Sequence, residues 1–491
     1  MINICDPIQY IPKLNGKPED YWQKLQDQCD KGRNAFDVDN APLMEIRRQI
    51  GKARLLPDAS TKIFALVQEL KKKAATIKDD YIKNKTLCKK GKEQNAEACG
   101  YVDYYDKFET ILGPVDEIRK PAKSPTSVPL VPLRSGNPTI NLPPPFKGHQ
   151  VQFDTGSSTS LFSKRFVESR PDNFLPLQIT SGDYGLGVYR IEDIKINIGN
   201  AAFSPQVGVA VSAVDEDGGT DREGQLIATL GLDFLLMRSV RFNYSKQSIV
   251  FDQNLDKELR TGKWEAIPLQ IRREGLFGGL FISLEVLLNG QATQMHFDTG
   301  AELSYVFESC LPKLPELPDA TNDKSCGYTG VNSRGSSSKT ISDVKVSLGG
   351  YDIRIPMDVL PADLPHVKLL LSKNICGMAG LNMFTRFNPI FDPATSTLYL
   401  ESPQKGQKIY SFKNFDFIYR QQFSYRYASD VTKGGSAEKA GLKTNDIILK
   451  INGSDAASMT GRQYIELSYA DTITLLIDRD GKKKTIRIKL H

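Results

Sequence analysis

Histidine and tryptophan are scarce in this sequence, and several motifs that mark common hydrolases are missing. The 491 residues contain four histidines, at positions 149, 296, 366 and 491, and two tryptophans. The zinc-peptidase motif H-E-x-x-H does not occur, which argues against a zinc peptidase. The G-x-S-x-G nucleophile elbow does not occur either. Because metal and nucleotide signatures are also missing, we expect no metal and no cofactor.

Long apolar runs and a strong charge of one sign are missing too. No apolar run reaches the roughly 18 residues that a transmembrane helix needs, so we expect no membrane span. The net charge is +6, from 64 basic and 58 acidic residues. Basic residues interleaved with aromatics do not stand out, so a solvated surface explains this charge better than nucleic-acid binding does. The chain has 40% apolar and 9% aromatic residues, as folded proteins do, and its length allows three or four domains.

Cysteine is sparse and unclustered. The seven cysteines form no C-x-x-C pair and no Cys/His cluster, so we expect no zinc or redox site. Cys310 and Cys326 are close in sequence. The distribution suits disulfides in an oxidising compartment, and free buried thiols suit it nearly as well. The N-terminus lacks signal-peptide features. The location therefore stays open, being periplasmic or secreted if a leader has been removed and cytoplasmic otherwise.

Residues 1–120 have a helical pattern. One stripe, at alternating spacings of four and three, consists of Ile63, Val67, Leu70, Ala74, Ile77 and Tyr81. We predict two further helices before it, one around residues 21–29 and another around residues 43–50. The helical region is expected to pack on the domains that follow, as a scaffold or as a removable pro-segment. A proline-rich linker follows at residues 121–127.

The sequence then repeats one order of features, in residues 128–260 and again in residues 261–402. Each repeat has short β-type runs and an Asp-Thr-Gly turn, with Asp154 and Asp298 lying 298 − 154 = 144 residues apart. Each has a later apolar segment with a glycine, and Gly231 and Gly380 lie 380 − 231 = 149 residues apart. Repeats of this length indicate a duplicated domain. Two carboxylates held close together cannot both ionise easily, so such a pair serves as acid and base and activates water.

This matched pair of motifs resembles the aspartic peptidases. The D-T-G-A form of the second turn is similar to the retropepsin-like branch, and two such units in one chain are similar to the arrangement of pepsin. The resemblance covers residues from about 127 to 402. It implies a mainly β, two-lobed domain, with lobe 1 at 128–260 and lobe 2 at 261–402. It also implies hydrolysis of a peptide or protein substrate.

The resemblance implies roles for individual residues. Asp154 and Asp298 would form the catalytic dyad. The supporting residues would be Thr155 and Thr299, which exchange hydrogen bonds between the turns, Gly156 and Gly300, which let the backbone pass close by, and Gly231 and Gly380, which lie beneath the turns. Only a residue without Cβ allows such an approach.

A β-hairpin flap over the substrate is also implied. Tyr184 and Tyr328 lie in glycine-rich stretches at the corresponding places and are candidate flap aromatics, although ordinary hairpin loops explain them as well. His296 precedes Asp298 by two residues, so on a strand the two side chains share a direction. We expect His296 to pack near the dyad without a catalytic role.

The last segment, residues 410–491, is of another kind. Residues 434–453 read GGSAEKAGLKTNDIILKING and predict a short helix, a turn, an apolar strand and an Asn-Gly turn. This run resembles PDZ domains of the bacterial type, which are small α+β barrels. The resemblance implies capture of a C-terminal peptide as an added strand. The binding loop is expected near residues 415–427, where no Gly-Leu-Gly-Phe equivalent is present.

The sequence therefore predicts a multidomain aspartic endopeptidase, mainly β, with a helical N-terminal region and a C-terminal PDZ domain. The alternative is a non-catalytic peptide-binding adaptor built on the same scaffold. Intact Asp-Thr-Gly turns in both repeats favour the enzyme, because a binding protein has no need of two acidic turns.

Overall fold

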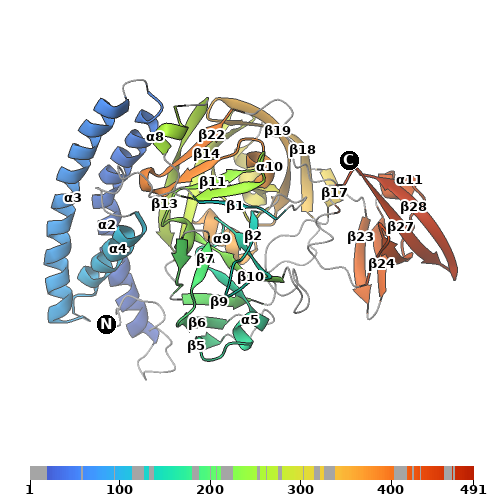
Figure 1. The fold of residues 1–491 in the computed structure, drawn as a ribbon, viewed down its shortest axis with the longest axis horizontal. Helices are drawn as coiled ribbons and strands as arrows, with labels where there is room; N and C mark the ends of the chain where they lie inside the picture. Colours follow the sequence, from blue (N-terminus) through green and yellow to red (C-terminus); the bar gives the residue numbers. More distant parts are fainter. Residues whose placement is uncertain are drawn as a thin grey trace.

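The computed structural model is a mainly β, multidomain protein (Figure 1). A helical bundle lies at one side of the molecule, a small β domain at the other, and the β-rich repeats lie between them. The structure describes residues 19–56, 59–92, 94–112, 126–131, 138–179, 187–198, 201–205, 207–211, 225–251, 255–260, 263–274, 279–301, 303–314, 321–325, 338–402, 417–422, 425–431, 433–457, 467 and 470–490. Within these ranges no helix has the length and apolar character needed to cross a membrane.

The described part of the N-terminal bundle consists of three helices, α2 (Glu19–Ala53), α3 (Ala59–Lys90) and α4 (Ala96–Leu112). The stripe on α3 faces the bundle interior, because Ile63, Val67, Leu70, Ile77 and Tyr81 are buried. The prediction of two separate helices before α3 was wrong. Both segments belong to the single helix α2, which continues through Pro42.

Packing explains why the proline does not end α2. A proline inside a helix costs about 3 kcal/mol, because it removes a hydrogen bond and crowds the preceding turn. Apolar side chains on both sides of Pro42 are buried in the main core, among them Phe36, Leu43, Ile46 and Ile50. Burial of one such side chain contributes about 1.5 to 3 kcal/mol, so together they offset the cost of the proline.

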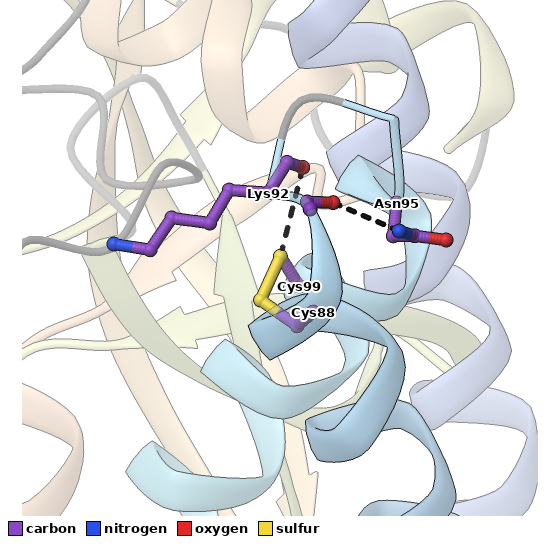
Figure 2. The surroundings of a disulfide bond; sticks show 5 residues. Cys88, Lys92, Asn95 and Cys99 are labelled. Atoms are coloured by element: carbon purple, nitrogen blue, oxygen red, sulfur yellow. Dashed lines mark hydrogen bonds between the residues drawn. A yellow bond between two sulfur atoms is a disulfide. The ribbon is translucent and has the colours of Figure 1, made fainter.

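A disulfide joins the end of α3 to α4. Figure 2 shows Cys88 and Cys99 linked across the turn between the two helices, with the Cys99 Sγ 3.8 Å from the Lys92 carbonyl oxygen. Asn95 stabilises the same turn by donating to the Gly91 carbonyl at 2.8 Å. Cys29 on α2 is also disulfide-bonded. The second described bridge joins Cys310 to Cys376.

The first repeat forms a seven-stranded sheet. In spatial order its strands are β2 (Thr139–Asn141), β3 (His149–Phe153), β10 (Gln225–Leu230), β4 (Leu161–Ser163), β9 (Val207–Val211), β6 (Gly187–Ile191) and β5 (Phe174–Ile179). The central strand β10 runs parallel to β3 and antiparallel to β4. It therefore holds together the two strands that flank the first Asp-Thr-Gly turn.

The second repeat has the same strand order. Its strands are β15 (Gln291–Phe297), β20 (Gly377–Ala379), β16 (Ser304–Phe307), β19 (Tyr351–Leu360), β18 (Ser338–Leu348) and β17 (Thr321–Ser325). Here β20 runs parallel to β15 and antiparallel to β16, as β10 does between β3 and β4. The sequence repeat is thus also a repeat of topology.

Strands from both repeats join in one sheet. In order these are β1 (Thr126–Pro129), β12 (Ser248–Phe251), β11 (Val240–Asn243), β21 (Ile390–Asp392), β22 (Thr397–Glu401), β13 (Trp264–Glu274) and β14 (Gly279–Leu288). Through the pairing of β14 with β15 this sheet continues into the strands of the second repeat given above. The pairing of β11 with β21, in which Val240 lies opposite Phe391, connects the first repeat to the second. The remaining short elements are α5 (Lys164–Glu168), β7 (Ile196–Ile198), β8 (Ala201–Phe203), α7 (Leu232–Leu235), α8 (Leu255–Glu258), η3 (Glu308–Lys313), α9 (Pro365–Leu371), α10 (Leu381–Phe384) and η4 (Pro393–Thr395).

Helix α2 docks on this shared sheet through polar contacts. Arg54 forms a buried ion pair with Asp392 at the end of β21, with 2.5 Å between Nη1 and Oδ2. Arg47 donates to the Ala394 carbonyl at 2.8 Å, and the Tyr399 hydroxyl donates to the Gly51 carbonyl at 3.0 Å. The bundle and the second repeat therefore share one interior at this point.

The described residues of the C-terminal domain form a six-stranded sheet and a short helix. Its elements are β23 (Phe417–Gln422), β24 (Tyr425–Val431), α11 (Ser436–Lys439), β25 (Ile447–Ile451), β26 (Ser454–Asp455), β27 (Thr472–Arg479) and β28 (Lys482–Lys489). The domain has a hydrophobic core of its own. The Asn452-Gly453 turn has positive φ at both residues, as the Asn-Gly motif predicts. Of residues 415–427, where a binding loop is expected, residues 417–422 and 425–427 lie in the paired strands β23 and β24, and the others lie outside the described residues.

Candidate active site

The two Asp-Thr-Gly turns follow equivalent strands and meet between the repeats. Asp154 follows β3, and its backbone N–H donates to the Leu230 carbonyl at 3.0 Å. Asp298 follows β15, and its N–H donates to the Ala379 carbonyl at 3.1 Å. Each turn thus begins fixed to the central strand of its own sheet. The site is formed by parts of the chain that are 144 residues apart in sequence (298 − 154).

Four hydrogen bonds between the turns involve the two threonines. The Thr155 N–H donates to the Thr299 hydroxyl at 3.0 Å, and the Thr299 N–H donates to the Thr155 hydroxyl at 2.9 Å. Each hydroxyl in turn donates to a carbonyl of the other repeat, that of Phe297 at 2.9 Å and that of Phe153 at 3.2 Å. Both threonines are buried. Buried and fully satisfied networks of this kind fix geometry, so the turns are held in register.

The two carboxyl groups lie against each other. Asp154 and Asp298 are joined by a side-chain hydrogen bond. The Asp154 Oδ1 accepts N–H bonds from Gly156 at 2.7 Å and from Gly300 at 3.1 Å. The Asp298 Oδ1 accepts N–H bonds from Gly300 at 2.8 Å and from Ala301 at 3.0 Å. The Gly300 amide therefore touches both carboxyl groups.

The surroundings change the acidity of both groups. Burial, followed by the adjacent charge and hydrogen bond of Asp298, raises the pKa of Asp154 well above its ordinary value. Burial also raises the pKa of Asp298, although hydrogen bonds from Asp154, Gly300 and Ala301 oppose that rise. The pair therefore retains a proton at a pH where an exposed aspartate has lost it, and the two groups titrate as one unit.

Each turn glycine lies directly beneath the carboxyl group of the opposite turn. A Cβ on Gly156 would lie 2.4 Å from the Asp298 Cγ, and a Cβ on Gly300 would lie 2.4 Å from the Asp154 Cγ. Contacts this short do not occur, so a methyl group would push the carboxyl groups apart. Glycine is needed here for the close approach of the two turns.

We expect Gly300→Ala to slow any reaction that needs the two carboxyl groups in contact by about 10²-fold, because a displacement of about 1 Å in a reacting group has an effect of this size. The control is Gly91→Ala in the turn between α3 and α4, where the nearest atom is the flexible end of the Gln94 side chain. Assays of both variants beside the wild type check this. Full activity in Gly300→Ala would contradict the described packing.

The glycines below the turns allow a second close approach. A Cβ on Gly231 would lie 2.6 Å from the Ser157 carbonyl oxygen, and one on Gly380 would lie 2.2 Å from the Leu303 carbonyl oxygen. The short helices α7 and α10 begin directly after these glycines. An aromatic contact fastens α10 to the strand before Asp298, since the Phe384 and Phe297 rings are 4.8 Å apart.

Sequence reasoning missed a serine in each repeat that forms hydrogen bonds with an Asp or Asn side chain and with the glycine below the turn. We call this group of three residues the polar latch. The hydroxyl of Ser160 donates to Asp233 at 2.7 Å and accepts from the Gly231 N–H at 3.2 Å. In the second repeat Ser304 donates to Asn382 at 2.7 Å and accepts from Gly380. The signal was the shared spacing, because each serine follows its aspartate by six residues (160 − 154 and 304 − 298). Each latch ties the strand after the turn to the glycine below it.

The two latches differ in charge. Burial raises the pKa of Asp233 to about 6, against hydrogen bonds from Ser160 and Phe234 that lower it. Asn382 in the equivalent position cannot ionise, and its amide donates to the Pro356 carbonyl at 3.0 Å. The support of the first turn thus titrates in mildly acidic solution, whereas the support of the second does not.

The candidate flap residues cannot be placed. Tyr184 and Tyr328 both lie outside the described residues. Within the described ranges, His, Cys, Asp and Glu side chains form no group of three or more that could hold a metal ion.

Comparisons with known proteins identify the C-terminal domain. The family model described as the PDZ domain matches residues 421–490. The curated relatives include a serine protease Do-like HtrA of Lactobacillus helveticus, 27% identical over 98 residues, which are 18% of this chain and 24% of that protein. They also include a serine protease Do-like HtrB of Bacillus subtilis, 40% identical over 67 residues, which are 13% of this chain and 15% of that protein. The chain therefore spans less than a quarter of the length of these relatives.

Among solved structures, an aspartic proteinase from Irpex lacteus aligns with 57% of this chain and 98% of its own chain. The sequence identity is 13% and the TM-score is 0.35, a value at which the likeness carries no argument. The chain thus has a PDZ domain at its C-terminus, and the chemistry of its β-rich repeats has to be inferred from their own residues.

Proposed function

We propose that the chain is an aspartic endopeptidase, in which the two repeats form two lobes and Asp154 and Asp298 form the catalytic dyad. One observation carries the proposal. The two carboxyl groups, one from each repeat, are hydrogen-bonded to each other, and each lies over the glycine of the opposite turn. Both turns need glycine for this close approach, which supports a function in which the two carboxyl groups act together.

The chemistry follows from a pair that shares one proton. The ionised carboxylate removes a proton from a water molecule bound between the two groups, and the protonated carboxyl polarises the scissile carbonyl. A tetrahedral gem-diol forms without a covalent bond to the enzyme, and the proton then passes to the leaving nitrogen. The proton belongs to the pair, because burial raises the pKa of both groups and the two titrate as one unit.

The PDZ domain would bind the C-terminal end of a substrate or partner peptide as an added strand. In the sheet of the PDZ domain, β23 is a terminal strand and pairs with β24. An added strand needs such an edge. The domain would thereby select substrates or hold them near the dyad.

A hydrolysis assay with denatured casein, from about pH 3 to about pH 7, tests this proposal. We expect activity with an acid-shifted optimum that a statine-type inhibitor blocks and a serine-directed fluorophosphonate leaves unchanged. Inhibition by the fluorophosphonate and not by the statine-type inhibitor would contradict the dyad and indicate a serine protease, the class that the names of the curated relatives give. No hydrolysis anywhere in the range would favour the alternative, a peptide-binding adaptor.

A further inference from the structure

A disulfide in the second repeat lies beside the strand that supports Asp298, and the proposed mechanism does not use it. The bridge joins Cys310, in η3 after β16, to Cys376, which directly precedes β20. Strand β20 contains Ala379, whose carbonyl accepts the Asp298 N–H at 3.1 Å. The covalent link therefore lies three residues from the carbonyl that fixes the start of the second Asp-Thr-Gly turn (379 − 376).

Cys376 lies where the three strands around this turn meet. Its N–H donates to the Gln294 carbonyl on β15, and its carbonyl accepts the N–H of Phe307, the last residue of β16, both at 2.9 Å. Cys310 follows Phe307 by three residues (310 − 307). The bridge thus joins the end of β16 to the start of β20, and so ties together two strands that position Asp298.

The first repeat positions its turn without a bridge. Its central strand β10 is six residues long, whereas β20 is three residues long. The cysteines are 12 residues after Asp298 and four before Gly380, and the same spacings in the first repeat lead to Phe166 and Ile227 (166 − 154 and 231 − 227). Both of these are buried apolar residues. A shorter strand forms fewer interstrand hydrogen bonds, so the covalent link replaces backbone pairing that the first repeat has.

Strand β20 must lie very close to β16. A Cβ on Gly377, the first residue of β20, would lie 2.2 Å from the Tyr305 carbonyl oxygen on β16. Gly380, directly after β20, has an equally close approach to the Leu303 carbonyl. The backbones therefore touch at both ends of β20. Without the bridge the two strands are held by hydrogen bonds and packing alone, and any separation displaces the carbonyl that holds Asp298.

The two sulfur atoms differ in burial. Cys310 is fully buried in an apolar cluster with Phe307 and Val367, whereas Cys376 is half-buried. A dithiol that attacks as thiolate at the Cys376 Sγ breaks the S–S bond, and the Cys310 Sγ leaves as a thiolate that takes a proton from water. The second thiol of the dithiol then resolves the mixed disulfide and releases the Cys376 thiol. The dithiol is oxidised by two electrons and the bridge is reduced.

We propose that the Cys310–Cys376 bridge is a redox-controlled positioning element, which holds Asp298 in the dyad when oxidised and lowers peptide hydrolysis when a dithiol reduces it. The bridge acts through β20 on the second turn only, because the first turn is supported by β10. Small displacements of a reacting group have large effects on rate, so a modest loosening of β20 is sufficient. This inference rests on the proposed function, since the activity under control is that of the dyad.

The first test needs no activity. Amide hydrogen exchange, followed by mass spectrometry, compares the oxidised chain with the chain reduced by dithiothreitol. We expect amides in residues 295–301 to exchange about tenfold faster after reduction, because β20 opens more often. The equivalent residues of the first repeat, 151–157, are the internal control and should not change. Unchanged exchange in 295–301, with Cys310 and Cys376 shown by alkylation to be reduced, would overturn the proposal, and so would failure of excess dithiothreitol to reduce this bridge.

The second test is the steady-state kinetics of casein hydrolysis. In the reduced chain we expect kcat to fall about tenfold with little change in KM, which is less than the roughly 10²-fold effect of a 1 Å displacement because the hydrogen bonds of β20 remain. Reoxidation with oxidised glutathione should restore kcat. An unchanged kcat in the reduced chain would refute the control of activity by this bridge.

Variants assign the effect to one bridge, since dithiothreitol also acts on the other disulfides. Cys310→Ala/Cys376→Ala should have the lowered kcat with and without dithiothreitol, whereas the matched Cys88→Ala/Cys99→Ala should respond to dithiothreitol as the wild type does. Full kcat in Cys310→Ala/Cys376→Ala would refute the proposal. If melting curves show that this variant is unfolded, the reversible change in the wild type decides. A wild type that is inert in both redox states, with exchange that still responds to reduction, would refute the proposed peptidase and not the positioning of the turn.

Discussion

Asp154→Asn and Asp298→Asn are each expected to lower kcat for peptide hydrolysis by about 10³-fold or more. General acid and general base catalysis each contribute about 10² to 10⁴-fold, and either variant removes a group that performs both during the cycle. Asparagine has nearly the same shape and still accepts the N–H bonds that Gly156, Gly300 and Ala301 donate. The loss would therefore report on proton transfer. Steady-state kinetics of the purified variants measure it.

The same variants should remain folded. Melting temperatures measured at several pH values test this independently of activity. Both carboxyl groups have raised pKa values in the folded state, so the folded chain binds more protons than the unfolded chain above about pH 4. Their contribution to the free energy of unfolding therefore falls as the pH rises through the raised pKa values. Asparagine does not titrate, so the substituted position no longer lowers the free energy of unfolding as the pH rises. We therefore expect each variant at pH 7 to melt at or above the wild-type temperature.

The exposed Asp352, on β19, provides the matched control. Asp352→Asn makes the same chemical change in the same repeat and should leave kcat unaltered. Wild-type kcat in either dyad variant would contradict the assignment of the dyad. Loss of activity together with a lowered melting temperature would indicate unfolding and not a failure of proton transfer.

Arg54→Met is expected to destabilise the protein by about 3 kcal/mol. The Arg54 and Asp392 side chains are 7% and 3% exposed, and removing one partner of such a pair leaves an uncompensated buried charge. The usual loss is about 3 to 5 kcal/mol. We choose the low end, because Arg47 also acts on Asp392. Urea unfolding followed by circular dichroism measures the change.

A double-mutant cycle with Asp392→Asn isolates the pair. We expect the double variant to be more stable than the sum of the single losses by about 2 kcal/mol. Lys345→Met is the control, because Lys345 and Asp352 form an exposed ion pair, which contributes under about 1 kcal/mol. If Arg54→Met lowered the free energy of unfolding no more than Lys345→Met does, α2 would not be docked as described.

This ion pair bears on the role of the helical region. Removal of the helical region, which carries Arg54, would leave Asp392 without the partner of its ion pair. We therefore infer that the region is a scaffold and not a removable pro-segment. Incubation at acid pH followed by gel electrophoresis tests this, and cleavage between about residues 110 and 130 that left an active, stable remainder would contradict it.

Some features could be predicted because their cause is local. The α3 stripe depends on helical periodicity, and the Asn452-Gly453 turn depends on residues that adopt positive φ. The partnership of Asp154 with Asp298 was predictable for another reason, since two copies of one motif in a duplicated chain point to two equivalent places in the fold.

Other features depend on contacts that sequence spacing does not reveal. Pro42 predicts a helix end, yet burial of both halves of α2 outweighs its local cost. The sequence left the disulfide pairing open, and the bridge from Cys310 to Cys376 joins residues 66 positions apart that only the fold brings together. His296 was expected near the dyad, but its hydrogen bond with the Ile282 carbonyl, at 2.9 Å, follows only from the pairing of β14 with β15.

The pairing of β11 with β21 has a consequence for dividing the molecule. Each repeat contributes strands to a sheet that the other completes, with Val240 opposite Phe391 and Arg241 opposite Ile390. A fragment that ended near residue 260 would present an unsatisfied strand edge, and so would its counterpart. Fragment complementation should therefore succeed only when the two halves fold in each other's presence, as interdependent parts of one folding unit.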